Sequence, residues 1–244
     1  MVFFRHTMMH KLKSILRDGE ITLVGLFRWG SNYTFLVNTR LGDQEVRAVY
    51  KPIRGEQPLW DFPSDTLAKR EVAAYEVSEA LGWGFVPLTV LRSEGPHGPG
   101  SIQLYVQGDP EDHYFSFSET EKKGLGRVVA FDVLLNNADR KGGHVIKDER
   151  GKVWLIDHGL SFHTDPKLRT VLWDLAGSAL EKDIIADLKR FRKALERDKQ
   201  LIEQLNGLLS PREIRALQYR TTRLIQNPCY PNPGAGRSYP WPPV

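Results

Sequence analysis

The segment "VWLIDHGLSF", residues 153–162, places a carboxylate and then a glycine directly after a short apolar run. The run is typical of a buried strand, and Asp157 follows at its end. Carboxylate oxygens are ligands that hard divalent cations prefer. Two interpretations stay open: an ordinary surface turn, or a metal-binding carboxylate at the end of a strand, with Gly159 allowing the backbone to turn sharply.

A second group of reactive side chains precedes this strand. The stretch "NNADRKGGHVI" contains Asp139, Arg140 and His144 in one glycine-containing loop, and Asp157 follows His144 by thirteen residues. Phosphoryl transfer needs a carboxylate that orients the acceptor, cations that neutralise phosphates, and ligands for a divalent metal. The residue types in this region are therefore those of a phosphotransferase.

Lys51 and Glu71 form a candidate ion pair. Lys51 ends the expected strand "VRAVYK", and Glu71 lies beside the apolar stripe of a helix expected over 64–81. A carboxylate in that position needs a partner, because burying a lone charge is costly, and Lys51 is the obvious candidate. The alternatives are a solvated lysine at a strand end and a glutamate that reaches water from the edge of the stripe.

The stretch "GLFRWGSNYTFLV" carries Gly30, Ser31 and Asn32 between two expected strands. Backbone N–H groups in such a turn can bind phosphates. Small polar residues also make most hairpin turns, so both interpretations stay open.

The elements expected around these residues divide the chain into a strand-rich part and a helix-rich part. A helix ended by Gly19, strands "YTFLV", "VRAVY", "VPLTVLR" and "GSIQLYV", and the helix with Ser64 as N-cap come first. Helices over 119–137, 180–206 and from the N-cap Ser210 follow, with a strand at "VWLID". This predicts an α+β fold with two lobes and a nucleotide cleft between them. The expected domains are a strand-rich lobe, 1–106, a helical lobe, 107–226, and a proline-rich tail, 227–244.

Composition excludes several classes of protein. The chain has 244 residues, 41% hydrophobic and 26% charged, with a net charge of +4, which is an ordinary globular composition. No block of Lys and Arg of the kind that grips nucleic acid is present. No apolar run approaches the roughly 20 residues of a membrane span, and no secretory signal is recognisable. One cysteine, Cys229, fits a reducing compartment, so we expect a cytoplasmic protein without an integral membrane segment.

The order and spacing of these motifs resemble the phosphatidylinositol 3/4-kinase-like group within the protein-kinase-like fold. The resemblance points to a small, uncharacterised bacterial branch, chiefly actinobacterial. It implies ATP and Mg2+ or Mn2+ as cofactors and a hydroxyl acceptor that is a protein, a small metabolite or a lipid. By resemblance, Asp139 is catalytic together with Arg140, and Asp157 and His144 bind the metal. The implied nucleotide-binding residues are Lys51, Glu71, Gly30, Ser31, Asn32, Gln103, Leu104, Tyr105 and Val106, with backbone at Leu104–Val106 meeting the adenine.

Two positions depart from the group's pattern. His144 stands where an Asn metal ligand is usual, and His158 stands where an aromatic residue is usual. Imidazole is a softer ligand that suits manganese or zinc better than magnesium. One alternative is therefore a degenerate kinase that binds nucleotide and metal without transfer. Another is a metal-dependent hydrolase that uses His144, Asp157, His158 and His163.

Overall fold

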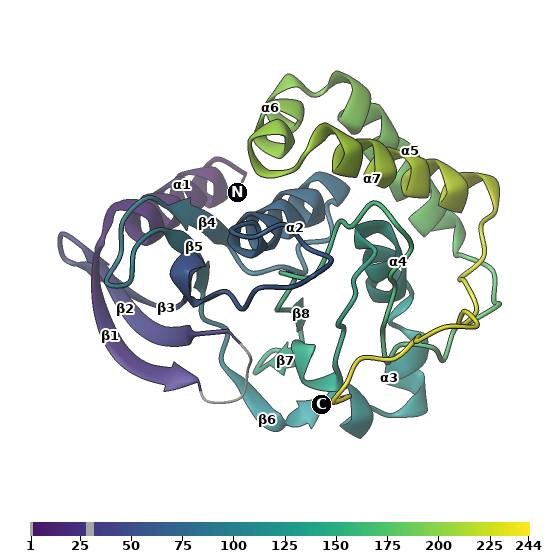
Figure 1. Ribbon diagram of the computed structural model, residues 1–244, viewed down its shortest axis with the longest axis horizontal. Coiled ribbons are helices and arrows are strands. Elements are labelled where there is room, and N and C mark those ends of the chain that lie inside the picture. The colour runs from purple at the N-terminus through teal and green to yellow at the C-terminus, as the bar shows by residue number, and fades with distance from the viewer. Residues whose placement is uncertain (1, 28–31) are drawn as a thin grey trace. The chain divides into compact units, whose positions relative to one another are not determined.

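The computed structural model describes residues 2–27 and 32–244, with side chains from residue 7 onward (Figure 1). The chain folds into two compact units. Unit 1 contains residues 1–72 and 87–106, and unit 2 contains residues 73–86 and 107–244. The strand-rich unit and the helix-rich unit together make the α+β architecture that the sequence predicts.

Unit 1 is an antiparallel sheet with one helix packed on it. The strands are β1 (Glu20–Phe27), β2 (Thr34–Leu41), β3 (Gln44–Pro52), β4 (Thr89–Arg92) and β5 (Gly100–Leu104), in the order β1-β2-β3-β5-β4. Helix α1 (Val2–Asp18) contacts β2, β3, β4 and β5. Its residues Ile15 and Leu16 are buried, as are Val37, Tyr50 and Ile102 on the strands. The expected helix end at Gly19 is confirmed, since α1 stops at Asp18.

Helix α2 (Leu67–Leu81) starts three residues later than the sequence predicts. We expected Ser64 as its N-cap. Instead, the Glu56 carboxylate accepts hydrogen bonds from the amides of Leu67 (3.2 Å) and Ala68 (2.9 Å). A side chain from the loop after β3 thus satisfies N–H groups that have no partner within the helix. The prediction of Ser64 failed because sequence signals for an N-cap consider only the residues next to the start of the helix, whereas Glu56 comes from an earlier loop.

Unit 2 is helix-rich and contains a second, smaller sheet. Its strands are β6 (Gly108–His113), β7 (Val145–Asp148) and β8 (Val153–Leu155), in the order β6-β7-β8. Its helices are α3 (Glu119–Lys123), α4 (Gly126–Leu135), α5 (Lys182–Arg197), α6 (Lys199–Leu208) and α7 (Pro211–Gln226). Residues 73–86 belong here by contact: the Trp83 indole donates to Asp187 at 2.8 Å, and the Leu155 amide donates to the Phe85 carbonyl at 2.9 Å.

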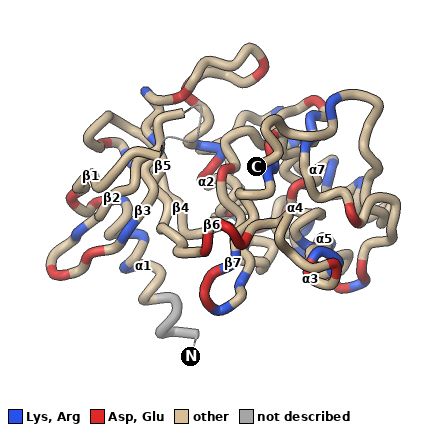
Figure 2. The backbone as a smooth tube through the Cα atoms, turned by 90° about the horizontal axis from the view of Figure 1, so that it is seen from below, with Lys and Arg blue, Asp and Glu red and all other residues tan. Residues whose placement is uncertain are grey.

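Several helices predicted from the sequence are present, but their boundaries differ from the prediction. The expected helix over 180–206 is two helices, because Asp198 ends α5 and caps α6 through the amides of Gln200 and Leu201. The region 119–137 is likewise two helices, α3 and α4. Ser210 caps α7 as expected, with Pro211 in the first turn. Strand β6 was not expected, because "GDPEDH" reads as a loop; Figure 2 shows its acidic residues as a red stretch.

Candidate active site

Lys51 and Glu71 form an ion pair within unit 1. Lys51 lies near the end of β3, and its ammonium group contacts the Glu71 carboxylate from α2. Only 3% of the Glu71 side chain is exposed, compared with 22% for Lys51. A buried carboxylate is stabilised by such a partner, which removes the alternative that Glu71 reaches water. The lysine is held in one orientation and remains partly accessible.

The turn of unit 1 that was predicted to bind phosphate contains Gly30, Ser31 and Asn32. Gly30 and Ser31 lie outside the described residues. The Asn32 side chain accepts a hydrogen bond from the Gln57 amide at 2.7 Å, which ties the start of β2 to the loop after β3. Asn32 therefore has a structural contact that the sequence did not predict.

The segment expected to meet adenine is the end of β5. Gln103 is buried, and its side-chain amide donates to the Thr89 hydroxyl at 2.8 Å, so it packs inside unit 1. The amides of Leu104 and Tyr105 donate to the carbonyls of Leu88 (2.8 Å) and Arg47 (3.0 Å). Val106, the last residue of the segment expected to meet adenine, is half-buried.

In unit 2, the loop after α4 is anchored by two asparagines. Asn136 ends α4 with a left-handed backbone, φ 53°, and its side chain bonds the backbone at His163, Asp165 and Lys167. The Asn137 side chain accepts from the Asp139 amide at 3.0 Å. These contacts hold the residues directly before Asp139 and the amide of Asp139 itself. The sequence had not singled out either asparagine.

The Arg140 side chain in this loop is fully buried and contacts several other residues of unit 2. Its guanidinium forms a bidentate ion pair with Asp132 of α4, with distances of 3.0–3.1 Å, and both side chains are almost completely buried. It also donates to the Ile156 carbonyl at 2.8 Å and lies 2.8 Å from the His158 ring nitrogen Nε2. We predicted that Arg140 acts in catalysis beside Asp139. Its exposed fraction is 0%, so in this structure the guanidinium is enclosed by protein groups.

His158 belongs to the core and does not face solvent. It is fully buried, contacts Arg140, and packs edge-on against Phe131 with ring centroids 5.8 Å apart. The described residues contain no cluster of three or more His, Cys, Asp or Glu side chains that could hold a metal. The hydrolase interpretation used His158 as a metal ligand, whereas its ring lies against Arg140 and Phe131 in the core.

His144 and Asp157 lie together, as the sequence predicts for two ligands of one metal. His144 Nε2 is 3.4 Å from a carboxylate oxygen of Asp157, and half of the Asp157 side chain is exposed. Asp157 follows β8 and has a left-handed backbone, φ 60°, which few residues other than glycine adopt. We expected Gly159 to make this turn. The structure places the unusual conformation on Asp157 itself, which is a common feature of functional sites.

Asp139 is the other accessible carboxylate among the predicted site residues of unit 2. Its side chain is 28% exposed, and the Lys141 ammonium lies 3.6 Å away. Burial raises the pKa of Asp139 to about 6, with a further contribution from the Asp157 carboxylate, while Lys141 and Arg237 oppose the shift. A carboxyl group with such a pKa can both accept and release a proton near neutral pH.

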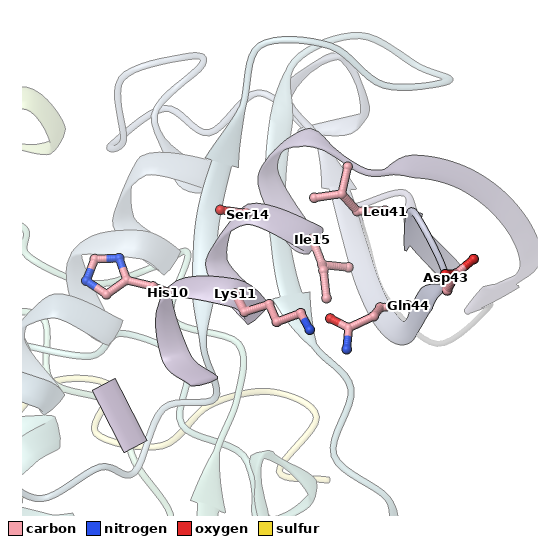
Figure 3. Close-up of a pocket in the computed structure, with 7 residues that line it drawn as sticks. All are labelled: His10, Lys11, Ser14, Ile15, Leu41, Asp43 and Gln44. Carbon is pink, nitrogen blue, oxygen red and sulfur yellow. The ribbon is translucent and has the colours of Figure 1, made fainter. Parts of the chain in front are cut away.

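A cavity of about 590 Å3 in unit 1 lies apart from all these residues. It is lined by His10, Lys11, Ser14 and Ile15 of α1 and by Leu41, Asp43 and Gln44 at the β2–β3 turn (Figure 3). None of the predicted site residues lines it. The cavity is therefore not evidence for the nucleotide site.

Comparison with known proteins places the chain in a family. No family model matches the sequence. The chain is 40% identical over 264 residues to Protein Rv2133c of Mycobacterium tuberculosis, and the match covers 94% of each chain. The chain belongs to the family of Protein Rv2133c. It is also 25% identical over 185 residues to phosphatidylinositol 4-kinase gamma 4 of Arabidopsis thaliana, covering 65% of this chain and 32% of that protein.

Solved structures with a similar fold support the expected fold class. Fam20 from hydra, in a structure with sugar, has a TM-score of 0.55 and 16% sequence identity, covering 91% of this chain and 88% of the other. The proinflammatory kinase CtkA of Helicobacter pylori has a TM-score of 0.54 and 11% identity, covering 88% and 94%. The α+β fold of this member of the Rv2133c family is thus kinase-like. Among the described residues, no helix combines the length and apolar character that crossing a membrane requires.

Proposed function

We propose that the chain is an ATP-dependent phosphotransferase of the phosphatidylinositol 3/4-kinase-like type, which transfers phosphate to a hydroxyl group. The observation that carries the proposal is the buried Lys51–Glu71 pair in one unit of a kinase-like fold. An ammonium group held by a buried carboxylate is a pre-oriented partner for phosphate oxygens. The partial match to a phosphatidylinositol 4-kinase supports the same reaction class.

Each site residue then has a separate task. Lys51 binds phosphate oxygens, Glu71 orients Lys51, and the Val106 amide donates to the adenine. Asp139 orients the acceptor hydroxyl and accepts its proton. Arg140 holds the loop and does not touch the substrate, because its guanidinium is buried against Asp132.

His144 and Asp157 suit a metal that arrives with the nucleotide. Magnesium keeps several waters and is commonly held by one or two protein ligands together with substrate phosphates. Two adjacent donors, one of them half exposed, fit that pattern better than a resident site with a full set of protein ligands. A bound metal would neutralise phosphate charge during transfer. The imidazole of His144 favours Mn2+ over Mg2+.

The phosphate acceptor is another protein, a small metabolite or a lipid. We further propose that the enzyme acts in the cytoplasm. Lys167 and Arg169 follow the Asp157 segment, but Asp165 opposes them, so this segment is not a strongly basic surface for lipid headgroups. Figure 2 shows Lys and Arg interspersed with Asp and Glu in the described residues.

Calorimetry with ATP and either Mg2+ or Mn2+ tests nucleotide binding. We expect Lys51→Ala and Asp157→Ala to weaken binding, whereas Asp139→Ala should leave binding intact and remove transfer. Lys189→Ala, an exposed lysine on α5, is the matched control and should behave like the wild type. His144→Asn should shift the preference from Mn2+ towards Mg2+.

The outcome separates three conclusions. No ATP binding at millimolar nucleotide with either metal would refute the proposal. Binding without transfer and without ATP hydrolysis would identify the chain as a nucleotide-binding module. If His144→Asn leaves the metal preference unchanged, His144 is not a ligand and Asp157 acts alone.

A further inference from the structure

The proline-rich segment 227–244 is part of unit 2 and packs against the rest of that unit. It leaves α7 and is drawn in yellow in Figure 1. Tyr230 is buried, its hydroxyl donates to the Glu181 carboxylate at 2.6 Å, and its amide donates to the Ser178 carbonyl at 2.9 Å. This first anchor fixes the start of the segment.

Ser238 is a second anchor, farther along the same segment. The residue is 8% exposed, and its hydroxyl donates to backbone carbonyls of the segment itself, at Gly234 and Gly236. Its own carbonyl accepts from the Thr170 amide at 3.1 Å and from the Trp173 indole at 3.2 Å. The turn around Ser238 is therefore attached to residues 170–173.

Those residues are in turn paired with the loop that carries Asp139. The Arg140 amide donates to the Arg169 carbonyl at 3.0 Å, and the Val171 amide donates to the Arg140 carbonyl at 3.1 Å. The segment 169–171 thus lies directly beside Arg140. Its middle residue, Thr170, is bonded to Ser238. A backbone path of hydrogen bonds leads from Ser238 to the residue after Asp139.

A third anchor reaches the loop directly. The Gly142 amide donates to the Pro243 carbonyl at 2.8 Å. On its other side Gly142 faces Phe115, because a Cβ atom at this position would lie 2.6 Å from the Phe115 ring. Gly142 is therefore confined between Phe115 and Pro243.

We propose that residues 237–243 form a strap that positions the catalytic loop, with Ser238 and Pro243 as positioning residues for Asp139. The strap touches the loop at Gly142 and supports it at Arg140, so Lys141 lies between two restrained backbone points and Asp139 directly precedes the first of them. Arg237, at the start of the strap, also places a positive charge in the surroundings of Asp139. The catalytic consequence rests on the proposed function, whereas the ordering of the loop does not.

Amide hydrogen exchange in the full-length protein tests the strap without using activity. Ser238→Glu introduces a carboxylate at a buried position and should detach the strap. We expect exchange at both Thr170 and Gly142 to become at least about tenfold faster, because local opening exposes these amides. Exchange at Gly151, whose amide donates to Asp148 in a separate turn at 2.8 Å, should stay unchanged. Ser64→Glu, the same change at an exposed loop serine, is the control variant.

Trp173→Phe provides a milder variant that keeps an aromatic side chain and removes the indole N–H that donates to the Ser238 carbonyl. It should change the same two amides in the same direction by a smaller factor. Faster exchange at Thr170 with unchanged exchange at Gly142 would overturn the proposal, since the strap would then be detached without loosening the loop. Unchanged exchange at both would overturn it as well, because Ser238 would not be an anchor.

The phosphotransfer assay adds the catalytic consequence. In the active enzyme, Ser238→Glu should lower kcat about tenfold and leave the KM for ATP unchanged, because the loop positions the acceptor-side carboxylate and not the nucleotide. A lower kcat together with an equally raised KM would contradict the role assigned to Asp139. If the wild type shows no transfer, the proposed function fails, and the exchange rates at Gly142 still decide whether the strap orders the loop.

Discussion

The guanidinium of Arg140 donates a 2.8 Å hydrogen bond to the carbonyl of Ile156, the residue directly before Asp157. Arg140 itself directly follows Asp139. One buried side chain therefore links the backbone next to the proposed catalytic carboxylate to the backbone next to the proposed metal ligand. The bidentate pair with Asp132 holds this side chain in place from α4.

Replacing Arg140 should destabilise the protein strongly. Arg140→Met leaves the Asp132 carboxylate buried without its partner, and the loss of a buried ion-pair partner costs about 3–5 kcal/mol. We expect the free energy of unfolding, measured by urea denaturation, to fall by about that amount. Arg212→Met, at an exposed position of α7, should change it by less than about 0.5 kcal/mol. Equal unfolding midpoints for the two variants would show that the pair contributes nothing net.

Removing the charge of Glu71 should weaken nucleotide binding and spare the fold. Glu71→Gln keeps an acceptor oxygen for Lys51 but loses the charge that holds the ammonium group, so ATP affinity should fall about tenfold. Calorimetry measures the affinity, and circular dichroism reports the fold. Glu79→Gln, an exposed glutamate on the same helix, is the matched control. Unchanged affinity in Glu71→Gln would separate the ion pair from nucleotide binding.

The cap that Glu56 provides should stabilise helix α2. It should thereby help to hold Glu71, which lies about one helical turn after Leu67. Glu56→Ala removes both acceptors for the amides of Leu67 and Ala68 and should cost about 1–2 kcal/mol of stability. Glu56→Gln keeps one acceptor oxygen and should lose less. Urea denaturation compares both with Glu94→Ala, an exposed loop glutamate. A Glu56→Ala variant as stable as that control would rule out the capping role.

The Asp139 carboxyl should titrate far above an ordinary aspartate. In the metal-free protein its pKa is raised from 3.8 to about 6, chiefly by burial, so the carboxylate is lost as the pH falls through about 6. Because the folded state binds this proton more tightly than the unfolded chain, the group adds stability as the pH falls from about 6 towards 3.8. NMR titration of carboxyl carbons should show this midpoint. Asp148, whose pKa is lowered by its hydrogen bond from Trp154, should titrate below 3.8 in the same spectra. A midpoint near 4 for Asp139 would contradict the prediction.

Much of the fold and part of the site could be read from local patterns. Local residue types and end signals predicted α1, β2, β3 and α7, and the Ser210 cap was recognisable because all its parts lie within four residues. The Lys51–Glu71 pair was predictable because a carboxylate beside an apolar stripe requires a partner. The same reasoning, applied to Asp132 in the apolar helix "VVAFDVLL", would have predicted its buried partner.

Other features depend on residues that are distant in the chain and adjacent only after folding. Glu56 caps α2 across a loop, Arg140 is buried because Asp132, Ile156 and His158 surround it, and Pro243 bonds to Gly142 about a hundred residues away. The sequence alone determined which side chains are candidates for the chemistry, because residue type and spacing are local properties. Only the tertiary structure decided which of these side chains are accessible and which are buried against the others, since burial and hydrogen-bond partners arise from long-range packing.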